Sequence, residues 1–313
     1  MKGNMETKAS YRLNEYEIKK IDNLVESGRD SESPNIFTVY VEGIDDVDFF
    51  NRWLRVSKME SNYRKLSIKI LEIKSDESIV VPGLGNCQKI RFAAEECKDD
   101  MRKIYISDKD LMTDSNVREY GHLDSLFFTD FPAVESYGFL DEILRKLNED
   151  RYGGKLKSLE NCGEFLSRYL RGVYFYRCVL HNQEKPEDMN SKAIELHKKL
   201  ASYVNSNRGN LSIDGFIEFT NGSIPNEMVN AMKSVGDNVD PRAYIYGHDV
   251  GSAIKGVIAC YEKELSSKYP ACRKTHIEQY VRDNYISEGF YKDDNLFKSL
   301  RMRIEYVYKL TTK

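Results

Sequence analysis

Five acidic side chains stand in short patterns that could bind a metal ion: Glu42, Asp46, Asp108, Asp110 and Glu135. Carboxylates that crowd together repel one another unless a cation lies between them. Hard divalent cations such as Mg²⁺ (or Mn²⁺) prefer oxygen ligands and often share substrate phosphates. Such ions stabilise the charge of an in-line phosphodiester displacement and lower the pKa of an attacking water. We therefore expect a Mg²⁺ (or Mn²⁺) site built from these five acids, with Glu42, Asp108 and Asp110 as the catalytic residues.

The segments that precede these acids must be strands of one sheet if the acids are to meet. The run IFTVYV is β-branched and aromatic throughout, which is typical of a strand buried on both faces. In an open α/β sheet, ligands bind at the carboxyl ends of the strands. We predict strands over 36–41, 65–73, 103–107 and 125–129, with helices over 45–56 and 87–97 between them. This alternation predicts an α/β domain with a mostly parallel sheet flanked by helices.

Simpler explanations exist for some of these acids. A single Asp-x-Asp is most often a pair of solvated loop residues, and acids at a helix start are favoured by the helix dipole. We prefer that explanation for Asp45 and Asp48. The ordered set of three strand ends is more specific than any one of its parts.

The chain changes character after residue 140, where helical patterns dominate. We expect an N-terminal helix over residues 1–29, a catalytic domain over 30–150 and a mainly α-helical C-terminal domain over 151–313. Two short pieces, 211–219 and 243–247, are strand-like in their alternation of apolar residues.

Composition narrows the class of protein. The formal net charge of −3 excludes a basic protein that coats nucleic acid, so any such contact must come from local patches and a metal. The six cysteines are scattered without a Cys-x-x-Cys pair, and we expect them to be reduced. No apolar run is long enough for a membrane span or a signal peptide, so we expect a cytoplasmic protein that does not contact membranes.

Three basic or imidazole side chains are candidates for substrate binding. Lys109 lies between the two aspartates, and His248 and Lys255 lie at and beyond the start of a predicted helix. They would contact a phosphate or transfer a proton. The alternative for His248 is a satisfied polar histidine beside the helix cap Asp249, and for Lys255 a solvated lysine is the simpler explanation. A nucleotide-hydrolysis motif is absent from the sequence.

The segments VYVEGIDDVDFF, YISDKDLM and FPAVESYGF resemble the Toprim fold, and more closely the DUF4435 group of Toprim-related proteins. The stretch AYIYGHDVGSAIKG is also similar to that group, so that the resemblance covers about residues 36–140 and 244–256. Matched by motif, Glu42 is the Toprim glutamate, Asp108 and Asp110 are the Asp-x-Asp pair, Glu135 is the acid of the Glu-Ser-Tyr motif, and Asp46 is the second acid of nucleases of the overcoming-lysogenization-defect type. The resemblance implies a Toprim-like sheet followed by helices.

The same resemblance implies a metal-dependent nuclease that cuts DNA or RNA, including tRNA. The group contains the nuclease effector of PARIS-type anti-phage defence, which implies a toxin effector controlled by a partner ATPase. We expect a homodimer as well. One alternative is a phosphatase or phosphotransferase that forms an aspartyl-phosphate on Asp108, although Met112 stands where that motif has Thr or Val. Another is a non-catalytic Toprim-like interaction module in which the acids are inert.

Overall fold

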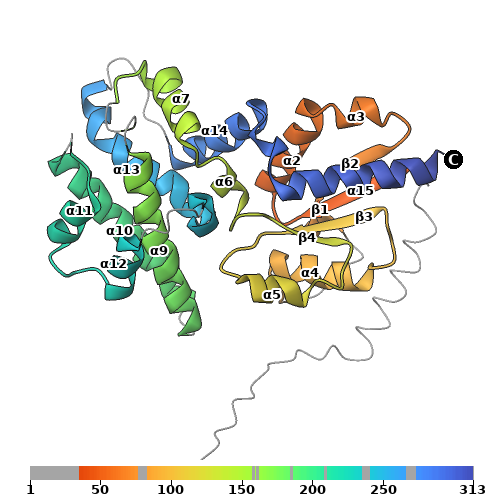
Figure 1. Ribbon diagram of the computed structural model, residues 1–313, viewed down its shortest axis with the longest axis horizontal. Helices are drawn as coiled ribbons and strands as arrows, with labels where there is room; N and C mark the ends of the chain where they lie inside the picture. Colours follow the sequence, from red (N-terminus) through yellow and green to blue (C-terminus); the bar gives the residue numbers. More distant parts are fainter. Residues whose placement is uncertain are drawn as a thin grey trace, which may run out of the picture.

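The computed structural model describes residues 35–76, 83–156, 159, 162–183, 186–207, 210–234, 240–265 and 273–312. The helix expected within residues 1–29 lies outside the described residues. Figure 1 shows an α/β half and a helical half side by side, which agrees with the predicted fold class at this level.

The α/β half is built on one parallel sheet of four strands in the order β2-β1-β3-β4. The strands are β1 (Ile36–Val41), β2 (Ser67–Glu72), β3 (Lys103–Ser107) and β4 (Leu126–Phe128). Because all four run the same way, their carboxyl ends meet at one edge. β1 and β3 are neighbours at the centre, so Glu42 and Asp108 follow adjacent strands.

Helices cover both faces of this sheet, as a parallel sheet requires. Successive side chains of a strand point to opposite faces. In β1, Phe37, Val39 and Val41 therefore belong to the larger core, whereas Tyr40 faces the other way and its ring stacks on that of Tyr105 at 5.3 Å. The helices of this half are α2 (Ile44–Val56), α3 (Met59–Asn62), α4 (Asn86–Glu96), α5 (Asp114–Glu119) and α6 (Val134–Tyr137), with the 3₁₀ turn η1 (Ile73–Ser75).

The helical half surrounds a core continuous with that of the sheet. Its elements are α7 (Asp141–Tyr152), α9 (Gly163–Asn182), α10 (Pro186–Ser206), α11 (Ile213–Thr220), α12 (Asn226–Lys233), η2 (Pro241–Tyr244) and α13 (Gly247–Leu265). The long helices α9, α10 and α13 pack against one another. None of the described helices is long and apolar enough to cross a membrane.

The last part of the chain returns to the sheet. Helix α14 (Lys274–Ser287) packs on α2, and after η3 (Phe290–Lys292) helix α15 (Asn295–Thr311) lies beside α2 in Figure 1. The ring of Phe297 in α15 lies 5.5 Å from that of Trp53 and 5.9 Å from that of Phe49. All described elements after β4 are helices, and helices from the end of the chain complete the sheet's core.

Two predicted strands are wrong. Segment 211–219 forms helix α11, and segment 243–247 consists of the end of η2 and the start of α13. Ile213, Phe216 and Thr220 are the buried residues of α11, a spacing of three and four that only a helix places on one face. The hydroxyl of Ser212 accepts the N–H of Gly215 at 3.1 Å and caps this helix.

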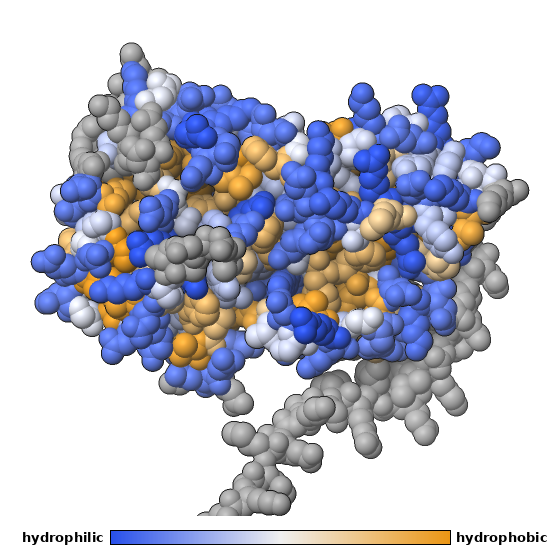
Figure 2. All heavy atoms as spheres, viewed as in Figure 1, coloured by the Kyte–Doolittle hydropathy of each residue, from blue (hydrophilic) through white to orange (hydrophobic). Residues whose placement is uncertain are grey.

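The surface of the molecule is mostly polar. Figure 2 shows hydrophilic residues over most of the face in view, with apolar residues gathered into separate patches. One such patch lies over the α/β half in the region where Figure 1 places β3 and β4.

Candidate active site

A cavity of about 380 Å³, here called the acid cavity, lies at the carboxyl edge of the sheet. All five acids that the sequence predicts as metal ligands line it: Glu42, Asp46, Asp108, Asp110 and Glu135. They come from the end of β1, the start of α2, the loop after β3 and helix α6. The strand order explains the convergence, because β1 and β3 are neighbours and both end at this edge.

Glu42 is held in place by the strand beside it. Its Oε1 accepts the backbone N–H of Asp108 at 2.9 Å and the hydroxyl of Ser107 at 3.0 Å. The side-chain amide of Asn86 at the start of α4 also donates to the carbonyl of Glu42, at 2.7 Å. Burial raises the pKa of Glu42, and the bonds from Asp108 and Ser107 oppose that rise. The carboxyl group is thus fixed in orientation and is a better proton acceptor than an exposed glutamate.

Asp46 closes the first turn of α2. Its Oδ2 accepts the N–H of Gly43 at 2.9 Å, and its side chain is buried. Burial, with repulsion from Glu135 and Glu42, raises the pKa of Asp46 to about 7. One residue thus serves both as the helix cap that favours an acid at this position and as a member of the acid cavity.

The two aspartates after β3 are also partly buried. Burial followed by repulsion from Asp46 and Glu42 raises the pKa of Asp108 well above its usual range. Burial and repulsion from Glu42 raise the pKa of Asp110 to about 7. Asp110 has a φ of 48°, a left-handed conformation that Asp tolerates better than most residues. This turn is fixed by the bond from the Asp110 N–H to the carbonyl of Pro132, at 2.8 Å.

Glu135 is paired with a cation from the far end of the chain. Nη1 of Arg282 in α14 lies 2.5 Å from Glu135 Oε1, and its Nη2 lies 2.9 Å from Oδ1 of Asp45. Helix α13 begins directly against this pair, because a Cβ on Gly247 would lie 2.4 Å from Glu135 Oε2. Glu135 is therefore engaged with Arg282 rather than directed solely at the other acids.

The chemistry of this donor set suits a hard divalent cation. Within the described residues, no group of three or more His, Cys, Asp or Glu side chains is already arranged to hold a metal ion. Glu42 and Asp46 instead accept backbone N–H groups, and Glu135 pairs with Arg282, so these carboxylates do not converge on one point. Burial and mutual repulsion raise the pKa values of Asp46, Asp108 and Asp110, and a bound cation would offset both effects.

The predicted substrate-binding residues are divided among different places. His248 is exposed and lines the acid cavity. Lys109 instead pairs with Asp114 at 2.6 Å and lines a neighbouring cavity. Lys255 lies about 10 Å beyond His248 along α13, given 1.5 Å per residue, and does not line the acid cavity.

Asp249, next to His248, has a structural role. Its carboxylate is buried and accepts the guanidinium of Arg177 at 2.8 Å and Nε2 of His197 at 3.0 Å. Burial alone would raise the pKa of Asp249, yet these two partners hold it at about 2. The bonds tie α9, α10 and α13 together, and they place Arg177 over the ring of Tyr246 at 4.5 Å.

Four residues near the acids were not predicted. Ser107 and Arg91 lie beside Glu42, Tyr246 lines the acid cavity, and Arg282 pairs with Glu135. A hydroxyl on the last residue of β3 was a usable signal for Ser107. Arg91, Tyr246 and Arg282 arrive through tertiary packing, and their local sequence gives no such signal.

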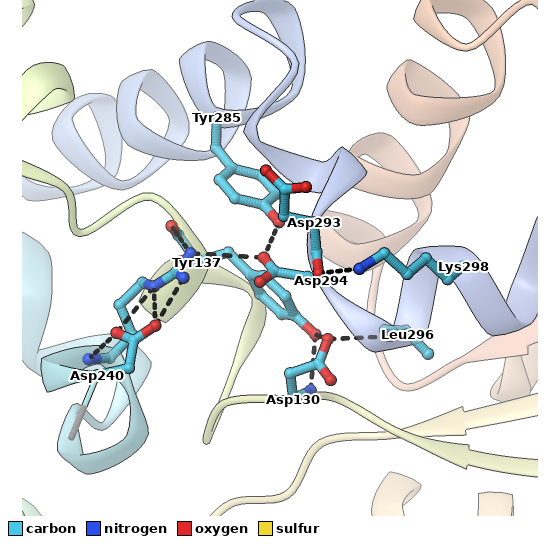
Figure 3. A network of polar contacts seen from close by, with 9 residues as sticks. Asp130, Tyr137, Asp240, Tyr285, Asp293, Asp294, Leu296 and Lys298 are labelled. Atoms are coloured by element: carbon cyan, nitrogen blue, oxygen red, sulfur yellow. Dashed lines mark hydrogen bonds and ion pairs between the residues drawn. The ribbon is translucent and has the colours of Figure 1, made fainter. Parts of the chain in front are cut away.

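A network of polar contacts fixes helix α6, which carries Glu135 (Figure 3). Asp130, which also follows β4, accepts the N–H of Leu296 at 3.0 Å and the hydroxyl of Tyr137 at 3.2 Å. Tyr285 donates to Asp294, which Arg242 also approaches at 3.4 Å. Asp130 thus joins α6 to the start of α15 and does not line the acid cavity.

Comparison with known proteins adds no assignment, since no protein-family model and no curated protein sequence matches the chain.

Proposed function

We propose that the protein is a metal-dependent nuclease of the Toprim type that hydrolyses phosphodiester bonds of nucleic acid. One observation carries the proposal: the five predicted acids line one cavity at the edge of a parallel sheet, together with Asp45 and Glu72, and the pKa values of four of the five are raised. Selection for stability alone would not gather like charges in this way. The order of the motifs along the sheet supports the Toprim assignment.

Asp46, Asp108 and Asp110 would hold Mg²⁺ or Mn²⁺, with Glu135 joining them if it leaves Arg282. When bound, such an ion supplies positive charge to the phosphate and lowers the pKa of a water molecule. Glu42 accepts the proton of the attacking water, because two donors fix the orientation of its carboxyl group and its raised pKa makes it a stronger base than an exposed glutamate. The water oxygen forms the new bond to phosphorus.

The bond from phosphorus to the leaving oxygen breaks in the same displacement. His248 is exposed at the acid cavity and can donate a proton to that oxygen. Arg91 supplies a cation to the substrate phosphate, since it reduces the pKa rise of both Glu42 and Asp110 through its charge. With these roles water is the nucleophile, and no side chain has to form a covalent bond to phosphorus.

The resemblance to anti-phage effectors supports a further part of the proposal. A toxic nuclease without a nucleotide-hydrolysis motif needs external control, so we propose a regulatory ATPase partner and a homodimer. Co-purification with neighbouring gene products and measurement of the molar mass in solution test this part. A monomer that is toxic without any partner would contradict it.

The activity is tested by incubating the purified chain with plasmid, single-stranded DNA and total tRNA. Each substrate is given Mg²⁺ or Mn²⁺, with EDTA as the control. We expect cleavage of at least one substrate that EDTA abolishes. Hydrolysis of phosphate monoesters without cleavage of any nucleic acid would favour an aspartyl-phosphate enzyme based on Asp108, and no hydrolysis of either class would favour an interaction module.

A further inference from the structure

A groove continues from the acid cavity along the boundary between the two halves. A cavity of about 610 Å³, here called the inner cavity, shares Asp110 and Tyr246 with the acid cavity. A third cavity of about 890 Å³, the outer cavity, shares the loop 111–113 with the inner one. Figure 1 shows α5 and the C-terminal end of α9, which supply much of the inner wall, facing each other at this boundary. Even by itself, the inner cavity has a volume in the range of ordinary ligand sites, which is roughly 300–1,000 Å³.

Aromatic rings line this groove at successive points. Tyr246 and Tyr120 line the inner cavity, and Tyr174, Phe175 and Tyr244 line the outer one. Most of these rings are only partly buried, so part of each remains accessible to a ligand. The rings of Phe175 and Tyr244 stack at 5.3 Å. Such surfaces bind flat, unsaturated groups by stacking.

Cationic side chains pack over some of these rings but do not form a continuous positively charged surface along the groove. Arg171 lies 4.7 Å over the ring of Tyr244, and Arg91 lies 5.5 Å over that of Tyr120. Lys109 and Arg177, which also line the groove, are already neutralised by Asp114 and Asp249. The groove therefore offers more stacking surface than free positive charge, which does not suit a ligand held by its phosphates alone.

We propose that this groove binds unpaired nucleotides next to the scissile phosphate, with one base in the inner cavity and further bases along the outer one. The inference rests on the proposed nuclease function and specifies its substrate as a single-stranded segment of DNA or RNA. In a duplex the faces of the bases are covered by neighbouring base pairs, so only an unpaired strand presents them to aromatic side chains. The shared residues Asp110 and Tyr246 join base binding to the site of hydrolysis.

The test measures affinity rather than cleavage. The full chain is titrated, with Ca²⁺ in place of Mg²⁺ to prevent hydrolysis, against fluorescent oligonucleotides of one length. The probes are single-stranded DNA, single-stranded RNA, their duplexes, and a single strand with a run of abasic sites. Of the two single strands, we expect the one that binds better to bind at least about tenfold more tightly than its duplex or the abasic strand. Comparison of the DNA and RNA probes identifies the sugar that the groove accepts.

Phe175 provides a variant whose effect is specific to stacking. Alanine substitution of a stacking residue costs affinity by roughly 5- to 150-fold, which Phe175→Ala should reproduce and Phe175→Tyr should restore. Phe219→Ala is the matched control, because this partly exposed ring lies on α11 and does not line the groove. The comparison of probes on the unaltered chain stands even if Phe175→Ala fails to fold.

Two results would overturn the inference: a duplex or abasic strand that binds as tightly as the single strand, or a folded Phe175→Ala chain with unchanged affinity. The proposed function fails separately. Preference for single strands without hydrolysis in Mg²⁺ or Mn²⁺ would refute the nuclease and leave the groove as a nucleotide-binding site. Efficient cleavage of duplex without preference for single strands would refute the groove alone.

Discussion

Two aspartates of the acid cavity keep their protons at pH values where an exposed aspartate has lost its own. Asp46 and Asp110 have pKa values of about 7, because burial and neighbouring acids penalise their charged forms. In the unfolded chain the same residues titrate near 3.9. Between about pH 4 and pH 7 the folded state therefore binds more protons than the unfolded state, so the free energy of unfolding falls as pH rises through this window.

We predict that the melting temperature without divalent cations falls from pH 5 to pH 7.5, and that Asp110→Asn weakens this fall. Each pKa unit corresponds to about 1.4 kcal/mol, so Asp110→Asn should stabilise the chain at pH 7.5 by on the order of 1 kcal/mol or more. Mg²⁺ should reverse the fall in the unaltered chain. Thermal melting across pH measures both effects, with the exposed Asp48→Asn as control. A melting temperature that rises steadily over this range would contradict the assignment of these pKa values.

At this scale the acids could be predicted and their partners could not. Glu42, Asp108 and Asp110 directly follow apolar runs that predict parallel strands, so the sequence already places them at one edge of the sheet. Arg282 lies 147 residues beyond its partner Glu135, and Tyr246 reaches the cavity only through the packing of α13 on α6. Such partners depend on tertiary contacts that no local pattern encodes. The same holds for Lys255, whose helix was predicted but whose distance from the acids was not.

Among the elements, the contact between α6 and α13 controls the position of Glu135. A Cβ on Gly247 would meet Glu135 Oε2 at 2.4 Å and Ala133 Cβ at 2.7 Å, so this helix start can approach only as glycine. We predict that Gly247→Ala lowers phosphodiester hydrolysis by at least about tenfold, since a displacement near 1 Å at an active site can cost about 100-fold. Initial rates and thermal melting measure the effect.

Gly256→Ala, in the same helix, is the matched control. Its Cβ would first meet Leu200 Cδ2 at 3.5 Å, an ordinary contact, so we expect unchanged hydrolysis and a gain of about 0.5–1 kcal/mol in stability. Equal activity in the two variants would show that the close approach at Gly247 does not position the site.

Strands were predicted well from their short continuous apolar runs, as in β3, whose predicted and observed bounds coincide, and long helices from their helical spacing. Helix α11 was mistaken for a strand because the apolar residues Leu211, Ile213, Ile217 and Phe219 are two or four positions apart, as in an alternating strand. Phe216 fits a helical spacing instead. The cap from Ser212 and the burial of Phe216 decide between the two. A short apolar run can fit both the alternation of a strand and the spacing of a helix, and only its tertiary surroundings decide which one forms.

For the whole molecule, the aromatic cluster around Phe297 joins the last helices, α14 and α15, to the α/β half, and this core is continuous with that of the helical half. The ring of Phe297 contacts Trp53 in α2, Tyr137 in α6 and Tyr285 in α14, and all four side chains are buried. A core shared in this way favours unfolding in one cooperative step.

We predict that fluorescence of Trp53, the only tryptophan, and far-ultraviolet circular dichroism report the same denaturant midpoint. Phe297→Ala should lower the free energy of unfolding by about 3–5 kcal/mol and shift both signals together. Separate midpoints, or a shift confined to the tryptophan signal, would show that the halves unfold as independent domains.

The most direct test of the central claim is phosphodiester hydrolysis by Glu42→Ala, measured with its melting temperature in the presence and absence of Mg²⁺. We predict a loss of at least about 100-fold in rate, as expected when a proton acceptor is removed. Stability without metal should hold or rise, because one of several repelling carboxylates is gone. Asp48→Ala on the exposed face of α2 should keep the activity of the unaltered chain. Full hydrolysis by a folded Glu42→Ala chain would contradict the proposed mechanism.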